Sequence, residues 1–167
     1  MKKIDATNAT THASASDAPR DLVLYVEDEE ENWQVTEMRL RKMYRLLWAR
    51  TAEEACDLIR EHGSDISAIL MDIQLQGSPL DGVDLTRALR GKMPLVPECG
   101  ELDPIAVPII FVTAHAASAS EPELLEAGGN KLITKPVNFT SLTLTLTNLH
   151  LNKVLPGRRP SATNAGR

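Results

Sequence analysis

The sequence predicts an α/β fold in which a doubly wound parallel sheet of five strands carries helices on both faces. Short apolar runs typical of buried strands alternate along the chain with segments of helical periodicity. Four of these runs end in polar residues, and the carboxyl ends of parallel strands border the crevice in which such sheets bind ligands. The polar residues at these four ends are Glu27 with Asp28, Asp72, Thr113, and Lys135.

The composition is typical of one globular domain. The chain has 167 residues, of which 43% are hydrophobic and 25% are charged. This length suffices for one core and is too short for two ordinary domains. A net charge of −5 offers no broad basic surface, so we expect no direct nucleic-acid binding. The two cysteines, Cys56 and Cys99, lie in different kinds of segment and form neither a disulfide framework nor a metal signature, which fits a reducing cytoplasm.

Both ends of the chain are poor in residues that could be buried. We therefore expect disordered tails over 1–20 and 156–167, around one domain that spans 21–155. Lys2 and Lys3 are followed by no apolar stretch, so no signal peptide is expected. No apolar run approaches the roughly 20 residues that cross a bilayer, so we expect no membrane insertion.

The first half of the domain predicts two strand–helix units. A strand over 22–26 precedes a helix over 30–43, which begins in a run of glutamates suited to a helix N-terminus. A weaker strand over 44–49 precedes a helix over 52–62, and Gly63 should end that helix.

The second half continues the alternation up to a last helix that returns along the sheet. Pro122 suits the first turn of a helix, and Gly128 with Gly129 should end it. The expected elements are a strand over 67–72, a helix over 81–90, a strand over 107–112, a helix from Glu121, a strand over 131–134 and a helix over 139–154.

Two segments fit this alternation less well. Residues 91–108 contain four prolines and few periodic apolar positions, so we expect a long loop, and loops of that length are often functional. The alternation of leucine and threonine over 142–146 favours a strand, but length and topology favour a helix. A helix would carry two opposite leucine stripes: Leu142, Leu146 and Leu149 against the sheet, and Leu144, Leu151 and Leu155 as a candidate interaction surface.

The polar strand ends together suit phosphoryl chemistry on a divalent cation. Hard cations take oxygen ligands, which three carboxylates supply, and a lysine ammonium neutralises phosphate. Each of these residues is common at a strand end. The order and spacing of the whole set is what indicates a site.

In this order and spacing, the set resembles the receiver domain of bacterial two-component response regulators. The resemblance covers about residues 21–154, with an acidic pair after the first strand, a lone aspartate after the third, Thr-Ala after the fourth and Lys-Pro after the fifth. Asp28 and Asp72 are 44 residues apart, and Thr113 and Lys135 are 22 apart, both typical of receivers.

A receiver implies a flavodoxin-like sheet with strand order 2-1-3-4-5. The 41 residues between Asp72 and Thr113 exceed the usual spacing. The extra residues fall within 75–82 and in the proline-rich loop, which we expect to lie away from the site.

The resemblance implies that Asp72 accepts a phosphoryl group from the phosphohistidine of a kinase or of a histidine phosphotransfer protein. Carboxylates are known nucleophiles of this kind. It also implies Mg²⁺ as a cofactor, held by Asp28, Asp72 and the backbone carbonyl of Gln74, with Glu27 at longer reach through a metal-bound water.

Further roles follow from the same resemblance. Lys135 would pair with the acyl phosphate oxygen, and Thr113 would turn its hydroxyl onto the phosphoryl group. His115 and Gln74 would border that group and tune its hydrolysis. Leu132 departs from the family, because receivers usually carry a Tyr or Phe three residues before the lysine that swings inward on phosphorylation. This chain would then transmit through other contacts, or couple weakly to its output.

We therefore expect a stand-alone receiver, because the C-terminal tail is too short for an output domain. We expect it to be cytoplasmic and to act as a switch that catalyses only its own phosphorylation and dephosphorylation. Its partners would be the phosphodonor, a downstream protein and, through the last two helices, a second copy. A phosphatase of the haloacid dehalogenase type stays open as an alternative, although Gln74 stands where that class has a second aspartate. A degenerate receiver that binds partners without phosphotransfer also stays open.

Overall fold

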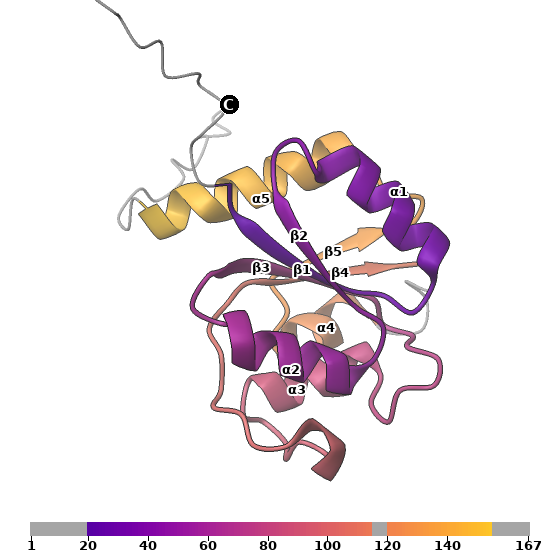
Figure 1. The fold of residues 1–167 in the computed structure, drawn as a ribbon, viewed down its shortest axis with the longest axis vertical. Helices are drawn as coiled ribbons and strands as arrows, with labels where there is room; N and C mark the ends of the chain where they lie inside the picture. The colour runs from indigo at the N-terminus through magenta and orange to yellow at the C-terminus, as the bar shows by residue number, and fades with distance from the viewer. Residues whose placement is uncertain (1–19, 115–119, 155–167) are drawn as a thin grey trace, which may run out of the picture.

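In the computed structural model, which describes residues 20–114 and 120–154, five strands form one sheet in the order β2-β1-β3-β4-β5 (Figure 1). Every neighbouring pair of strands runs parallel. The doubly wound, flavodoxin-like order predicted from the sequence is therefore confirmed. The strands are β1 (Leu22–Val26), β2 (Arg45–Ala49), β3 (Ile66–Met71), β4 (Ile109–Thr113) and β5 (Lys131–Thr134).

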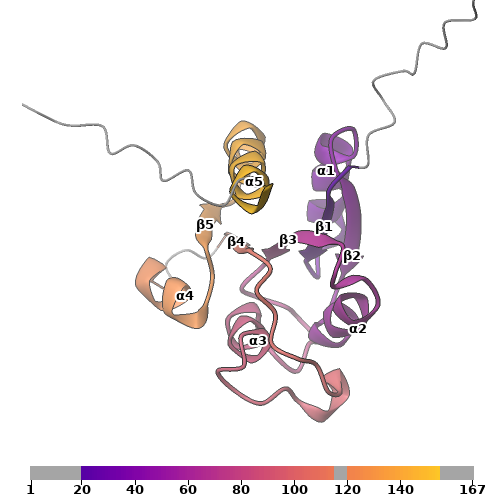
Figure 2. The same ribbon diagram turned by 90° about the vertical axis from the view of Figure 1, so that its left-hand side faces the viewer.

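Helices cover both faces of the sheet and enclose two apolar cores (Figure 2). Successive strand side chains alternate between the faces, so Leu24 and Val26 of β1 point to one core while Val23 and Tyr25 point to the other. The helices α1 (Glu30–Leu40) and α5 (Phe139–Val154) lie on one face, and α2 (Ala52–His62), α3 (Gly82–Leu89) and α4 (Glu121–Ala127) lie on the other.

Two predicted boundaries shift for local reasons. The first helix ends at Leu40 and not at 43, because the backbone N–H groups of Met43 and Tyr44 both donate to the Leu40 carbonyl, at 2.9 and 3.0 Å, and close a turn. The fourth strand begins at Ile109 and not at 107, because Pro108 has no N–H for the ladder.

The other element predictions hold to within a residue. Gly63 follows the last residue of α2, and Gly128 ends α4 with a φ of 113°, a left-handed conformation that suits glycine. The leucine–threonine alternation lies in α5, so the prediction of a helix is confirmed over that of a strand.

The long segment over 91–108 is a loop, as predicted, but it contains a short 3-10 helix, η1 (Pro97–Cys99), which packs on α2. Arginines hold this segment to the domain. The Arg60 guanidinium donates to the Cys99 carbonyl at 2.7 Å, and Arg90 donates to the carbonyls of Ile105 and Val107 at 2.7 and 2.8 Å. The loop is therefore ordered by side-chain donors to its backbone rather than by its own periodicity.

Both cysteines are free thiols buried in one apolar cluster, Cys56 in α2 and Cys99 in η1. Burial, with a smaller contribution from neighbouring Cys99, raises the pKa of Cys56 to about 12. Because the thiolate is the reactive form, we expect alkylation of the folded protein at pH 8 to be at least about 100-fold slower than that of the unfolded chain. Pulse labelling with iodoacetamide and intact mass measurement, with and without urea, checks this. Comparable labelling rates in the two states would contradict it.

Candidate functional site

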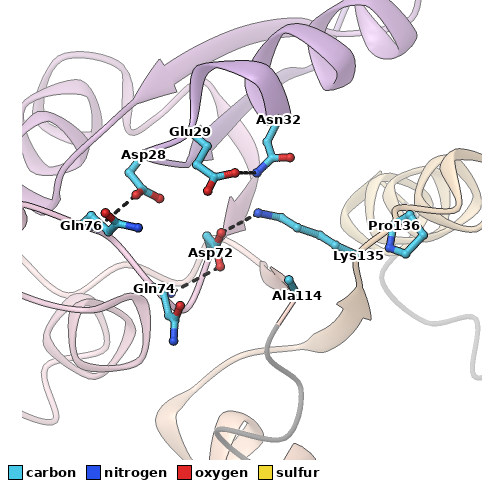
Figure 3. Close-up of a pocket in the computed structure, with 9 residues that line it drawn as sticks. All are labelled: Asp28, Glu29, Asn32, Asp72, Gln74, Gln76, Ala114, Lys135 and Pro136. Carbon is cyan, nitrogen blue, oxygen red and sulfur yellow. Dashed lines mark hydrogen bonds and ion pairs between the residues drawn. The ribbon is translucent and has the colours of Figure 1, made fainter.

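A cavity of about 430 Å³ lies at the carboxyl edge of the sheet, where β1, β3, β4 and β5 end (Figure 3). Two of the predicted site residues, Glu27 and Thr113, are fully buried and do not line it. The residues that line the cavity are Asp28, Glu29, Asn32, Asp72, Gln74, Gln76, Ala114, Lys135 and Pro136.

Lys135, which follows β5, contacts two carboxylates, Asp72 (Figure 3) and Glu27. Its Nζ donates to Oδ2 of Asp72 at 2.6 Å and to Oε2 of Glu27 at 2.7 Å. Burial by itself lowers the pKa of Lys135, but the hydrogen bonds and negative charges of Asp72 and Glu27 outweigh burial and raise that pKa overall. Lys135 is therefore held as a cation beside the carboxylate of Asp72.

Glu27 is wholly buried and fully hydrogen bonded. Its Oε2 accepts from Lys135 and from the Tyr25 hydroxyl at 2.5 Å, and its Oε1 accepts from the Asn32 amide at 3.0 Å and from the Glu29 N–H at 3.3 Å. A carboxylate has about four acceptor sites, and four protein donors use them here. Glu27, which is buried and does not line the cavity, thus holds the ammonium of Lys135 in place.

Sequence reasoning missed two of these donors, Tyr25 and Asn32. The sequence did contain a signal for Tyr25. Residues two apart along a strand point to the same face, so Tyr25 and Glu27 were expected to lie on one side of the sheet. Burial, and then the charge of Glu27, raise the pKa of Tyr25, which keeps the phenol protonated as a donor. Asn32 lies on the first turns of α1 and also donates to Glu29 at 2.8 Å.

Asp28 is partly exposed, and its Oδ2 accepts from the backbone N–H of Gln76 at 3.2 Å. The expectation that residues 75–82 lie away from the site is therefore wrong for Gln76, which also lines the cavity. Asp28, Asp72 and Glu27 can each offer one oxygen such that the three oxygens lie within 4.8 Å of one another. Three carboxylates with one neighbouring ammonium form an oxygen-rich, anionic donor set that fits a hard divalent cation.

The remaining predicted site residues are placed as follows. Gln74 is exposed at the cavity, and its N–H donates to Oδ1 of Asp72 at 3.3 Å. Thr113 ends β4, and its carbonyl accepts from the Lys135 N–H at 2.8 Å, which ties the lysine-bearing loop to β4. Leu132 is partly buried against the core under α2, α3 and α4. His115 lies outside the described residues.

The chain belongs to the response regulator receiver domain family, whose model matches residues 23–147. Over 117 residues it is 32% identical to the polar-differentiation response regulator DivK of Brucella ovis, a match that covers 70% of this chain and 85% of DivK. Over 121 residues it is 31% identical to the autoinducer 2 sensor kinase/phosphatase LuxQ of Vibrio vulnificus. That match covers 72% of this chain but only 12% of LuxQ.

Solved receiver structures share the fold. The receiver domain of the Francisella response regulator 1452 aligns with a TM-score of 0.67 and 21% identity, over 80% of this chain and 99% of that one. A second match is the co-crystal structure of the Saccharomyces cerevisiae histidine phosphotransfer signaling protein Ypd1 and the receiver domain of its downstream response regulator Ssk1. That match has a TM-score of 0.66 and 26% identity, and it covers 83% of this chain and 94% of the other.

Receivers are signalling switches of two-component systems, and an acidic pocket of the kind seen here binds their Mg²⁺. Within 20–114 and 120–154, no helix is long and apolar enough to cross a membrane.

Proposed function

We propose that this chain is a cytoplasmic response regulator receiver that accepts a phosphoryl group on Asp72 and changes its partner binding in response. The arrangement of Asp72 carries the proposal: its carboxylate lines the cavity, and one oxygen is 2.6 Å from the Lys135 ammonium. Phosphoryl transfer needs a positioned nucleophile and neutralisation of negative charge, and this pair supplies both.

The transfer itself is a displacement at phosphorus. A carboxylate oxygen of Asp72 forms the new P–O bond while the P–N bond of a phosphohistidine breaks, and the imidazole nitrogen keeps the electron pair. Lys135 offsets charge on the acyl phosphate oxygen that results. Thr113, at the end of the neighbouring strand, turns its hydroxyl toward the phosphoryl group after transfer.

Mg²⁺ is the cofactor that the donor set favours. Asp28, Asp72 and the Gln74 carbonyl would hold it, and Glu27 would act at longer reach, since its two oxygens already accept four protein donors. A bound Mg²⁺ offsets the repulsion between the incoming phosphoryl group and these carboxylates. Without the metal, transfer should be slow.

The phosphodonor would be a histidine kinase or a histidine phosphotransfer protein. Support comes from the similarity to the Ssk1 receiver, which was crystallised with the histidine phosphotransfer signaling protein Ypd1. A downstream protein would read the phosphorylated state. We propose no catalysis beyond the chain's own phosphorylation and dephosphorylation.

A phosphorylation assay tests this function. Wild-type protein with Mg²⁺ and acetyl phosphate is expected to gain one phosphoryl group by intact mass. An Asp72→Asn variant is expected to gain none, because an amide is a poor nucleophile, and excess chelator should suppress labelling of the wild type. Asp81→Asn is the matched control, since Asp81 caps α3 outside the cavity.

Three outcomes would contradict the proposal. Phosphorylation that persists in Asp72→Asn contradicts the assigned nucleophile. Phosphorylation of the wild type that is unchanged by excess chelator contradicts the assigned metal. A wild type that takes no phosphate would support the degenerate receiver instead. The family match to receivers speaks against a phosphatase of the haloacid dehalogenase type, and Gln74 stands where that class has its second aspartate.

The last helix offers a surface for a second copy. One leucine stripe of α5 is buried, with Leu142 and Leu146 only 1% and 3% exposed, whereas Leu144 and Leu151 are 60% and 47% exposed. Leu155, the third residue assigned to the outer stripe, lies outside the described residues. Leu125 on α4 is also exposed, so both of the last two helices carry apolar surface. We propose that this surface forms a homodimer that depends on phosphorylation.

A double variant Leu144→Glu, Leu151→Glu is expected to remain folded and to lose association, because it places charge on an exposed apolar stripe without touching the core. Sedimentation velocity before and after phosphorylation measures this. Ser141→Glu with Asn152→Glu adds the same charge at exposed α5 positions and serves as the control. Unaltered association of the leucine variant in both states would eliminate this surface.

A further inference from the structure

Trp48, on the edge strand β2, makes a hydrogen bond that reaches the acidic loop of the site. Its indole N–H donates to the backbone carbonyl of Glu27 at 2.7 Å. That carbonyl belongs to the peptide that joins Glu27 to Asp28, the residue that lines the cavity. A tryptophan N–H is a donor only, and when partly buried it usually finds a partner.

The indole is held in place by two neighbours. Trp33 of α1 stacks on it with ring centroids 5.3 Å apart and planes 4° apart. The Arg50 guanidinium lies 5.3 Å from the centroid of the Trp48 ring. The Trp48 indole is therefore held by contacts with Trp33 of α1 and with Arg50, which follows β2.

This donor completes the attachment of the acidic loop to β2. The backbone N–H of Glu27 donates to the Ala49 carbonyl at 2.9 Å, so β2 holds Glu27 by both its N–H and its carbonyl. Because a peptide unit is planar, fixing the Glu27 carbonyl also fixes the N–H and Cα of Asp28. The Asp28 side chain is held separately, by the N–H of Gln76 at 3.2 Å.

We propose that Trp48 is a positioning residue of the metal centre: its indole N–H fixes the Glu27–Asp28 peptide and thereby the place of the Asp28 carboxylate. The inference rests on the proposed function, because it takes Asp28 as a Mg²⁺ ligand. It deepens that function by adding a donor 20 residues along the chain from Asp28, outside the cavity lining.

Two matched variants separate this role from simple packing of the aromatic pair. Trp48→Phe keeps an aromatic ring for the stack and removes the donor, whereas Trp33→Phe alters the same stack and leaves the donor in place. Titration calorimetry with MgCl₂ is expected to give a Kd about threefold to tenfold higher for Trp48→Phe, the loss typical of one hydrogen bond. Trp33→Phe is expected to bind Mg²⁺ as the wild type does.

A kinetic readout accompanies the titration. At subsaturating Mg²⁺, phosphorylation of Trp48→Phe by acetyl phosphate should be slower than that of the wild type, and added Mg²⁺ should narrow the difference, because the variant weakens metal binding. If Trp48→Phe does not fold, benzothienylalanine at position 48 keeps the indole shape, with sulfur in place of the N–H, and gives the same two measurements.

The outcomes are distinguishable. If Trp48→Phe binds Mg²⁺ with the same Kd as the wild type, the role of Trp48 is overturned and the proposed function stands. Equal weakening in Trp48→Phe and Trp33→Phe also overturns it, because packing then accounts for the effect. A wild type that binds no Mg²⁺ overturns both the role of Trp48 and the proposed metal centre.

Discussion

Lys135→Ala is expected to lower the free energy of unfolding by about 3 kcal/mol and to slow phosphorylation of Asp72. The Lys135 ammonium lies within 2.7 Å of the buried carboxylates of Glu27 and Asp72, and it is 13% exposed. Removing one partner of a buried ion pair leaves uncompensated charge, which typically costs about 3–5 kcal/mol. Urea unfolding without added metal measures the loss, and the acetyl phosphate assay measures the rate.

The control is Lys131→Ala, on β5, the strand that directly precedes Lys135. Lys131 is exposed and donates to the Thr145 hydroxyl, a neutral partner, so its loss should change stability by no more than about 0.5 kcal/mol. Equal effects of the two variants would show that the ion pairs of Lys135 contribute nothing special.

The pH dependence of this stabilisation has a definite sign. The pKa of Lys135 in the folded protein is raised above its ordinary value of 10.5, so folding favours the protonated form. The contribution is therefore fully present below about pH 10.5 and is lost as the pH rises through the folded pKa. The stability difference between wild type and Lys135→Ala should stay constant from neutral pH to about 10 and shrink above it.

Gly82→Ala is expected to be the most damaging single-methyl change near the site. A Cβ on Gly82 would lie 1.8 Å from the backbone oxygen of Asp72 and 2.8 Å from its carbonyl carbon, so the backbone that carries the nucleophile must move. We expect a loss of at least about 3 kcal/mol in the free energy of unfolding, because the backbone cannot rotate away from the added methyl group as a flexible side chain could. The phosphorylation rate should fall with it.

Gly77→Ala, in the loop that precedes α3, is the matched control. Gly77 has a φ of +74°, but a methyl group added there would meet nothing within 4 Å, so only the left-handed backbone is penalised. That penalty is about 1–2 kcal/mol. If Gly82→Ala proved no more destabilising than Gly77→Ala by urea unfolding, the close approach of α3 to Asp72 would be refuted.

Much of the fold was predictable because its signals are local. Apolar runs, helix caps and glycine stops depend on neighbours a few residues away, and they placed every strand and every α-helix that the structure describes to within a few residues. The short helix η1 was not predictable, since the segment is ordered by Arg60 and Arg90, whose own elements lie outside it. The helix end at Leu40 was missed because a turn, and not a change in periodicity, closes it.

By itself, the sequence determined the sheet, its helical layers and the chemistry gathered at its carboxyl edge, because strand ends in a parallel sheet converge whatever the details of packing. The tertiary structure alone decided which groups touch. It placed Lys135 between Asp72 and Glu27, brought the Asn32 amide to Glu27, and turned the Gln76 N–H toward Asp28. The directions of the groups that make these contacts depend on burial and on the path of the loops. Local periodicity in the sequence predicts neither.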